Sequence, residues 1–155
     1  MTIAFVQSPT VGTSTGTTNT VGSATYTTGN TLILTFAPSN GDIAINTITQ
    51  SSGSNVWFAM PACIRNESPG LEVWVSQGIT GFTGTITTNL SGSTPTVFCV
   101  AEYSGVGGVG IGNSSIPSTS NPSISLTTSG TTTWVVGGFS MNNTAAATAG
   151  TGTIR

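Results

Sequence analysis

Apolar and polar residues alternate with a period of two along most of this chain, and no other feature constrains its fold as strongly. Leu32, Leu34 and Phe36 fall on one face of an extended segment, while Ile33 and Thr35 fall on the other. This alternation is typical of a β-strand with one buried face. The 3.6-residue period of an amphipathic helix does not appear. The sequence therefore predicts an all-β fold.

Turn-forming Gly, Asn and Pro residues divide the chain into short strand-like segments, such as the Asn40-Gly41 step before the strand that begins at Ile43. The other predicted strands are 3–7, 21–27, 31–36, 56–64, 71–77, 82–90, 96–103, 123–128 and 132–140. About ten strands with such turns favour an antiparallel β-sandwich or jelly roll. A chain of 155 residues fits one domain, predicted over 1–155.

Two segments contain little apolar sequence. Residues 11–19 and 113–121 are rich in Ser, Thr, Gly and Asn, and they predict an arm or loop at 8–20 and a loop at 105–122.

Charged residues are scarce. The chain has two basic residues, Arg65 and Arg155, four acidic residues and no histidine or lysine, which gives a net charge of −2. Binding to nucleic acid or to an anionic membrane depends on clustered cations, so both partner classes are excluded. No run of about 20 apolar residues predicts a membrane-spanning helix. The N-terminal segment lacks the pattern of a signal peptide.

The low charge also favours self-association, because strand edges without lysine do not block pairing between molecules. The sequence ends at Arg155, soon after an apolar segment at 134–139. We therefore expect an open sheet edge that accepts a strand from a partner.

Cys63 and Cys99 lie in apolar strand-like runs. Two cysteines do not make a disulfide framework, and buried free thiols are favoured over a disulfide between them. Neither cysteine belongs to a zinc-binding motif.

Catalytic chemistry has few residues available. Without histidine, Ser-His-Asp and Cys-His sites are excluded, and the remaining acids are Asp42, Glu67, Glu72 and Glu102. A pair of carboxyls in one cleft could hydrolyse a glycoside, so Glu72 and Glu102 form one alternative. Glu72 alternates with apolar neighbours and is expected to face outward. Glu102 interrupts an apolar strand, and we expect a structural acid bonded to backbone or to Arg65.

Aromatic residues offer a second alternative, a face on which sugar rings stack. The candidates are Trp57, Phe58, Trp74, Tyr103 and Trp134. Core packing competes with this interpretation, because most Trp and Phe side chains in globular proteins are buried.

Cofactor sites are not predicted. The glycine-rich stretch at 105–112 lacks the following helix and the Lys-Ser/Thr ending of a phosphate-binding loop, so it predicts a flexible connection. Calcium requires clustered oxygen ligands; Asn40, Asp42 and nearby carbonyls could hold one ion, but the acids are otherwise scattered.

Four segments resemble a β-sandwich module of uncharacterised bacterial and phage proteins. These are Ile48-Thr-Gln-Ser-Ser-Gly-Ser-Asn-Val-Trp57, Leu71-Glu-Val-Trp-Val75, Val97-Phe-Cys-Val-Ala-Glu-Tyr-Ser-Gly105 and Trp134-Val-Val-Gly-Gly138. The resemblance covers about residues 30–140 and includes no catalytic motif. It implies a surface or virion accessory role, and in that family further strands follow the segment at Trp134.

The leading hypothesis is a non-enzymatic structural or attachment subunit, in a virion or on a cell surface, that associates with itself or with other structural subunits. A carbohydrate-binding module is the alternative, and a two-carboxylate glycosidase is the third.

Overall fold

The computed structural model describes residues 2–64, 68–110, 112–115, 124–128, 130 and 132–140. These residues form eleven strands and one short 3₁₀ helix, so the all-β prediction is confirmed. The strands are β1 (Ala4–Gln7), β2 (Gly12–Ser14), β3 (Thr18–Thr20), β4 (Ala24–Tyr26), β5 (Thr31–Pro38), β6 (Ile45–Gln50), β7 (Phe58–Ala59), β8 (Glu72–Ser76), β9 (Phe82–Gly84), β10 (Ile86–Leu90) and β11 (Thr96–Ser104). The helix is η1 (Pro61–Cys63).

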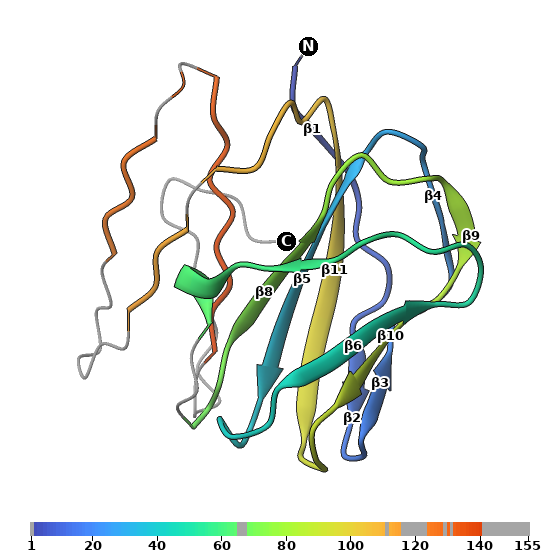
Figure 1. The fold of residues 1–155 in the computed structure, drawn as a ribbon, viewed down its shortest axis with the longest axis vertical. Coiled ribbons are helices and arrows are strands. Elements are labelled where there is room, and N and C mark those ends of the chain that lie inside the picture. Colours follow the sequence, from blue (N-terminus) through green and yellow to red (C-terminus); the bar gives the residue numbers. More distant parts are fainter. Residues whose placement is uncertain are drawn as a thin grey trace.

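The larger sheet has the strand order β1-β11-β5-β8-β7, and β2 also pairs with β11. All of its pairings are antiparallel. The pairing of β5 with β11 is the longest and runs from Thr31 opposite Tyr103 to Pro38 opposite Thr96. Figure 1 shows β8, β5 and β11 side by side at the centre of the molecule. We call this six-stranded sheet the main sheet.

The second layer consists of two antiparallel sheets, β3-β10-β6 and β4-β9. Backbone hydrogen bonds continue across the break between them: the Val21 amide donates to the Ile86 carbonyl, and the Ser51 amide donates to the Thr85 carbonyl, both at 3.0 Å. The segment from 82 to 90, predicted as one strand, is thus divided into β9 and β10. The two sheets behave as one interrupted layer.

The hydrophobic core lies between the two layers, as expected for a β-sandwich. It takes side chains from both: Val21, Tyr26, Leu32, Leu34, Phe36, Ile45, Ile79, Phe82, Ile86, Leu90, Phe98 and Val100. The alternation at Leu32, Leu34 and Phe36 therefore correctly identified the inward face of β5.

The outer face of the main sheet is also largely apolar. Ile33 on β5 lies opposite Val75 of β8 and Ala101 of β11, and Thr35 lies opposite Val73 and Cys99. A strand flanked by apolar side chains on both faces is typical of a sheet with both faces covered.

One predicted strand is much shorter in the structure. Of residues 56–64, only Phe58–Ala59 pair as a strand, and the 3₁₀ turn of η1 follows. Pro61 explains the end, because proline fixes its own φ angle and has no N–H for a sheet ladder.

The predicted arm or loop at 8–20 is wrong in part, because two short strands, β2 and β3, form there. Asn19 is buried, and its side-chain amide donates to the Gly12 carbonyl and to Thr96 Oγ1. The low apolar content of this segment predicted a loop, but hydrogen bonds from a buried polar side chain hold the two strands in place instead. Of the predicted loop at 105–122, residues 105–110 and 112–115 contain no regular element, and the remainder lies outside the described residues.

The two last predicted strands are also wrong where the structure describes them. Residues 124–128 and 132–140 contain no strand. Instead, 132–140 lies against the main sheet: the Trp134 and Tyr103 rings meet edge to face, with centroids 6.1 Å apart. The inner strands of that sheet already have neighbours on both sides, so the segment lies on its face.

Candidate functional site

Glu102, on β11, has no exposed surface and accepts three hydrogen bonds. The backbone amide of Thr27 and the side-chain amide of Asn30 donate to Oε1, at 2.8 and 2.7 Å, and Gln7 Nε2 donates to Oε2 at 2.5 Å. The carboxyl is therefore a buried structural hub that joins β1, β11 and the loop after β4. Arg65, its other expected partner, lies outside the described residues.

Tyr26 lies next to this hub in the core, where its ring stacks on Phe82 with centroids 4.6 Å apart. Its hydroxyl is buried and has no hydrogen-bond partner within the described part of the chain. Burial, and secondarily the charge of Glu102, raise the pKa of Tyr26 to about 12. The phenol is held protonated, which makes it unsuitable as a base near neutral pH.

Glu72, on β8, faces inward and is buried, so the expectation of an outward side chain is wrong. The Ile45 amide donates to its Oε1 at 3.1 Å, and Trp74 Nε1 donates to its Oε2 at 2.7 Å. These two hydrogen bonds compensate for the burial of the carboxyl. Because alternate residues of a strand face opposite sides, Val73 and Val75 then lie on the outer face of the main sheet. Burial raises the pKa of Glu72, while the two hydrogen bonds partly oppose that rise.

The two buried acids do not meet in one cleft. Glu72 lies opposite Phe36, whereas Glu102 lies opposite Leu32, four residues along β5 and on its other side. Standard strand dimensions place them about 16 Å apart, beyond the ~5–10 Å of paired glycosidase carboxyls. Each acid also has its own set of hydrogen-bond donors. The geometry opposes the two-carboxylate glycosidase.

The candidate aromatic residues do not form one stacking face. Trp57 and Trp74 are half-buried and pack against the core, and Tyr103 is buried. Trp134 is exposed, and the edge-to-face contact with Tyr103 occupies one side of its ring. Phe58 is exposed on β7, an edge strand that β8 and β5 separate from β11, the strand of Tyr103.

The remaining candidates have structural explanations. The Asp42 amide donates to Asn40 Oδ1 at 3.0 Å, which forms a local turn of the kind that asparagine stabilises. Within the described part of the chain, no three acidic or cysteine side chains gather to hold a metal ion. Cys63 and Cys99 are both thiols, half-buried where burial was expected. Desolvation raises the pKa of Cys99, which disfavours a reactive thiolate.

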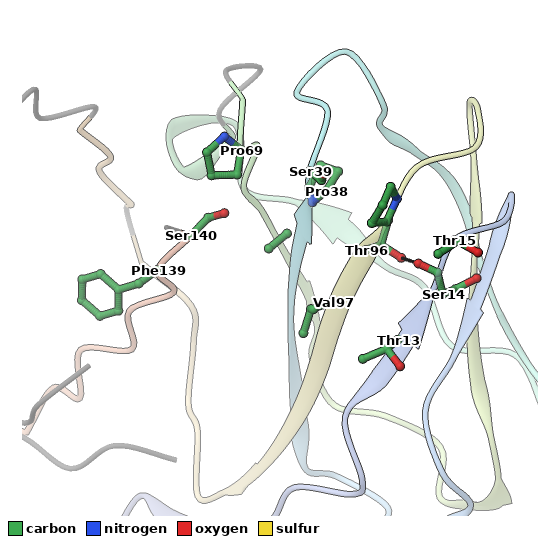
Figure 2. Close-up of a pocket in the computed structure, with 12 residues that line it drawn as sticks. Thr13, Ser14, Thr15, Pro38, Ser39, Pro69, Thr96, Val97, Phe139 and Ser140 are labelled. Atoms are coloured by element: carbon green, nitrogen blue, oxygen red, sulfur yellow. Dashed lines mark hydrogen bonds between the residues drawn. The ribbon is translucent and has the colours of Figure 1, made fainter. Parts of the chain in front are cut away.

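A groove with a volume of about 730 Å³ lies at one end of the main sheet, between β2 and residues 139–140 (Figure 2). Its lining is uncharged and consists of Thr13, Ser14, Thr15, Ala37, Pro38, Ser39, Pro69, Pro95, Thr96, Val97, Phe139 and Ser140. Figure 2 shows the Phe139 ring directed away from Val97, on the outer side of its segment. The groove is thus lined mainly by hydroxyl groups and prolines, and no aromatic ring points into it.

Apolar side chains are exposed at β7, the strand that forms one edge of the main sheet. Val56 is 68% exposed and Phe58 is 62% exposed. This strand contains no charged residue, and the same holds for the other edge strands of the described sheets, which are β1, β2, β3, β4, β6 and β9. Natural edge strands commonly carry lysine or another charge that prevents pairing between molecules. We call Val56, Phe58 and Ala59 the β7 edge.

Sequence reasoning missed the partners of the buried acids and the place of the groove. Gln7 and Asn30 lie 95 and 72 residues from Glu102 in the sequence, and no local pattern links them.

Among the described residues, no helix is long and apolar enough to cross a membrane. No family model, curated protein or solved structure matches this chain.

Proposed function

We propose that this protein is a non-enzymatic structural or attachment subunit whose rigid β-sandwich associates with other copies through sheet edges. A virion accessory protein or a subunit of a surface filament would both use a module of this kind. The β7 edge is the observation that carries the proposal, because it combines an open strand edge with exposed Val56 and Phe58 and lacks any blocking charge.

The electrostatics of the described surface support the same role. Of the three described acids, Glu72 and Glu102 are buried, which leaves Asp42 on the surface. The whole chain carries a net charge of only −2, so copies approach one another with little repulsion, and proteins near zero net charge tend to associate.

The buried acids support a non-enzymatic role. Glu72 and Glu102 bond to groups that fix neighbouring strands, and neither lines the groove. A protein that bears load in an assembly benefits from such internal links, because they tie distant segments of the chain together.

Size-exclusion chromatography with light scattering tests the proposal. The monomer mass is 15.5 kDa, and the wild-type protein is expected to exceed it increasingly as concentration rises. Phe58→Lys places a charge on the β7 edge and should lower the apparent mass at a given concentration. Thr17→Lys adds the same charge at the exposed turn between β2 and β3 and should leave association unchanged. A wild-type protein that stays monomeric at high concentration would refute the proposal.

A further inference from the structure

Residues 132–140 lie on the outer face of the main sheet but do not join it. Gly138 packs so closely that a Cβ there would come within 2.5 Å of Thr35 Cγ2 and 3.5 Å of Leu71 Cδ1. Together with the contact between Trp134 and Tyr103, this close approach holds the segment in place. We call residues 132–140 the strap.

The strap leaves most of its apolar surface uncovered. Val135 is 63% exposed, Phe139 is 75% exposed, and Trp134 and Val136 are exposed as well. Adjacent exposed residues of this size are unusual on a monomer, where contiguous apolar patches commonly mark interaction sites.

The backbone of the strap also lacks sheet partners. Residues 132–140 make no backbone hydrogen bond with the rest of the described chain, although their Thr, Trp, Val and Phe residues favour strands. An extended apolar segment with open backbone groups resembles an edge strand, which pairs readily with a second extended segment.

We infer that the strap is a second self-association surface and that its partner is the strap of another copy, paired antiparallel across a two-fold axis. Such a contact is self-complementary: each strap covers the exposed valines of the other and supplies its missing backbone partners. Neither the strap nor the outer-face residues Thr35 and Tyr103 beneath it carry a charge, so no like charges meet.

This inference rests on the proposed self-association and adds an assembly rule to it. Edge-to-edge pairing at β7 alone produces a closed dimer. Two separate two-fold contacts, one at the β7 edge and one at the strap, instead link copies into an open chain. The protein would then build a filament or layer.

Light scattering of variants with added lysines distinguishes the contribution of the β7 edge to association from that of the strap. Phe58→Lys should leave a dimer held by the straps, whereas the double variant Phe58→Lys/Val135→Lys should be monomeric. The control Phe58→Lys/Thr17→Lys carries the same added charge away from the strap and should remain a dimer. Val135 and Phe58 are both exposed, so neither lysine needs to be buried.

Cross-linking tests the pairing directly. In a protein with Cys63→Ser and Cys99→Ser, a single cysteine placed by Val136→Cys lies at the middle of the strap. It should form disulfide-linked dimers at least fivefold more efficiently than a single cysteine placed by Thr17→Cys. Equal yields would contradict strap pairing.

One outcome would overturn the strap while leaving the proposed function intact. If the wild-type protein associates but Phe58→Lys is fully monomeric, association occurs at the β7 edge alone. If the wild-type protein is itself monomeric, the proposed function fails and the strap inference fails with it.

A third possible outcome is a dimer in which the two copies exchange straps, so that each strap packs on the main sheet of the other copy. In the same cysteine-free background, Thr35→Cys/Gly138→Cys brings two Cβ atoms to the separation of a disulfide. A disulfide within one chain, with the dimer retained, supports pairing of straps that stay on their own sheets. Cross-links only between chains would refute it.

Discussion

Trp74 Nε1 donates a hydrogen bond to Glu72 Oε2 at 2.7 Å, and both side chains belong to the inward face of β8. Residues two apart on a strand share a face, so the acid and its donor come from adjacent inward positions. The Ile45 amide completes the arrangement from the start of β6 in the opposite layer. This small cluster joins the two layers of the sandwich.

Removing the indole donor should destabilise the protein. Trp74→Phe keeps an aromatic ring but leaves Glu72 Oε2 buried without that donor, at a cost of about 1–3 kcal/mol. Urea denaturation of wild type, Trp74→Phe, Glu72→Leu and the double variant measures the coupling. Strictly additive losses would show that the hydrogen bond contributes nothing.

The pH dependence of stability should reveal Glu72. Its pKa is raised above the ordinary value of 4.5, so the folded protein binds this proton more tightly than the unfolded chain. The corresponding stability is fully present below the ordinary pKa and is lost as pH rises through the raised pKa. Subtracting the Glu72→Gln profile from the wild-type profile, measured by urea denaturation from pH 3 to 8, should therefore give a falling curve. A flat or rising difference would contradict this assignment.

Glu102→Gln should lower stability more than it changes any association. The substitution replaces one accepting oxygen by an NH₂ group that faces the donors of Gln7, Thr27 or Asn30, at a cost of about 1–3 kcal/mol. Asp42→Asn removes an exposed acid and should stay within about 0.5 kcal/mol of wild type. Equal melting temperatures for Glu102→Gln and wild type would exclude a structural hub at this position.

Tyr26→Phe should not weaken the protein at pH 7, because the buried hydroxyl that it removes has no partner among the described residues. We expect unchanged stability or a gain of up to about 1 kcal/mol. The raised pKa of about 12 adds a second signature. Folded-state protonation of Tyr26 contributes stability that is lost as pH rises from about 10 through 12, and the variant should lack that loss. Identical alkaline unfolding of both proteins would refute this.

A side chain at Gly12 should destabilise the protein. A Cβ there would lie 2.6 Å from the Phe98 ring and 2.8 Å from the Thr20 carbonyl oxygen, so Gly12→Ala should cost about 1–3 kcal/mol by overpacking. At Gly107 no atom lies within 4 Å of the corresponding Cβ position, and Gly107→Ala provides the matched control. Thermal unfolding that ranks the two variants equally would contradict the tight packing between β2 and β11.

The fold class was predictable because alternation is a local property of the sequence. Leu32, Leu34 and Phe36 identified the inward face of β5 without any knowledge of its neighbours. Local sequence patterns did not predict strands whose formation depends on contacts with distant parts of the chain. Buried Asn19 anchors β2 and β3 through its amide group, and no apolar periodicity indicates such an anchor.

The candidate site was less predictable for the same reason. The sequence singled out Glu102 because an acid interrupts an apolar strand, but its partners come from distant segments. The pattern around Glu72 predicts the wrong face, because the apolar residues on either side of the acid suggest that they point toward the core and the acid points outward. The outer face of the main sheet is apolar too, so alternation on β8 did not distinguish inside from outside.

The position of β11 in the main sheet also has a consequence for synthesis on the ribosome. Within the described chain, β1 and β2 have β11 as their strand partner, and β11 ends at Ser104. Until that strand emerges, the N-terminal strands cannot pair, and β5 lacks one of its two neighbours. Contacts between such distant segments slow folding and prolong the exposure of apolar strands. The nascent chain therefore exposes apolar strands, and with them a risk of aggregation, until β11 has emerged and paired with its neighbours.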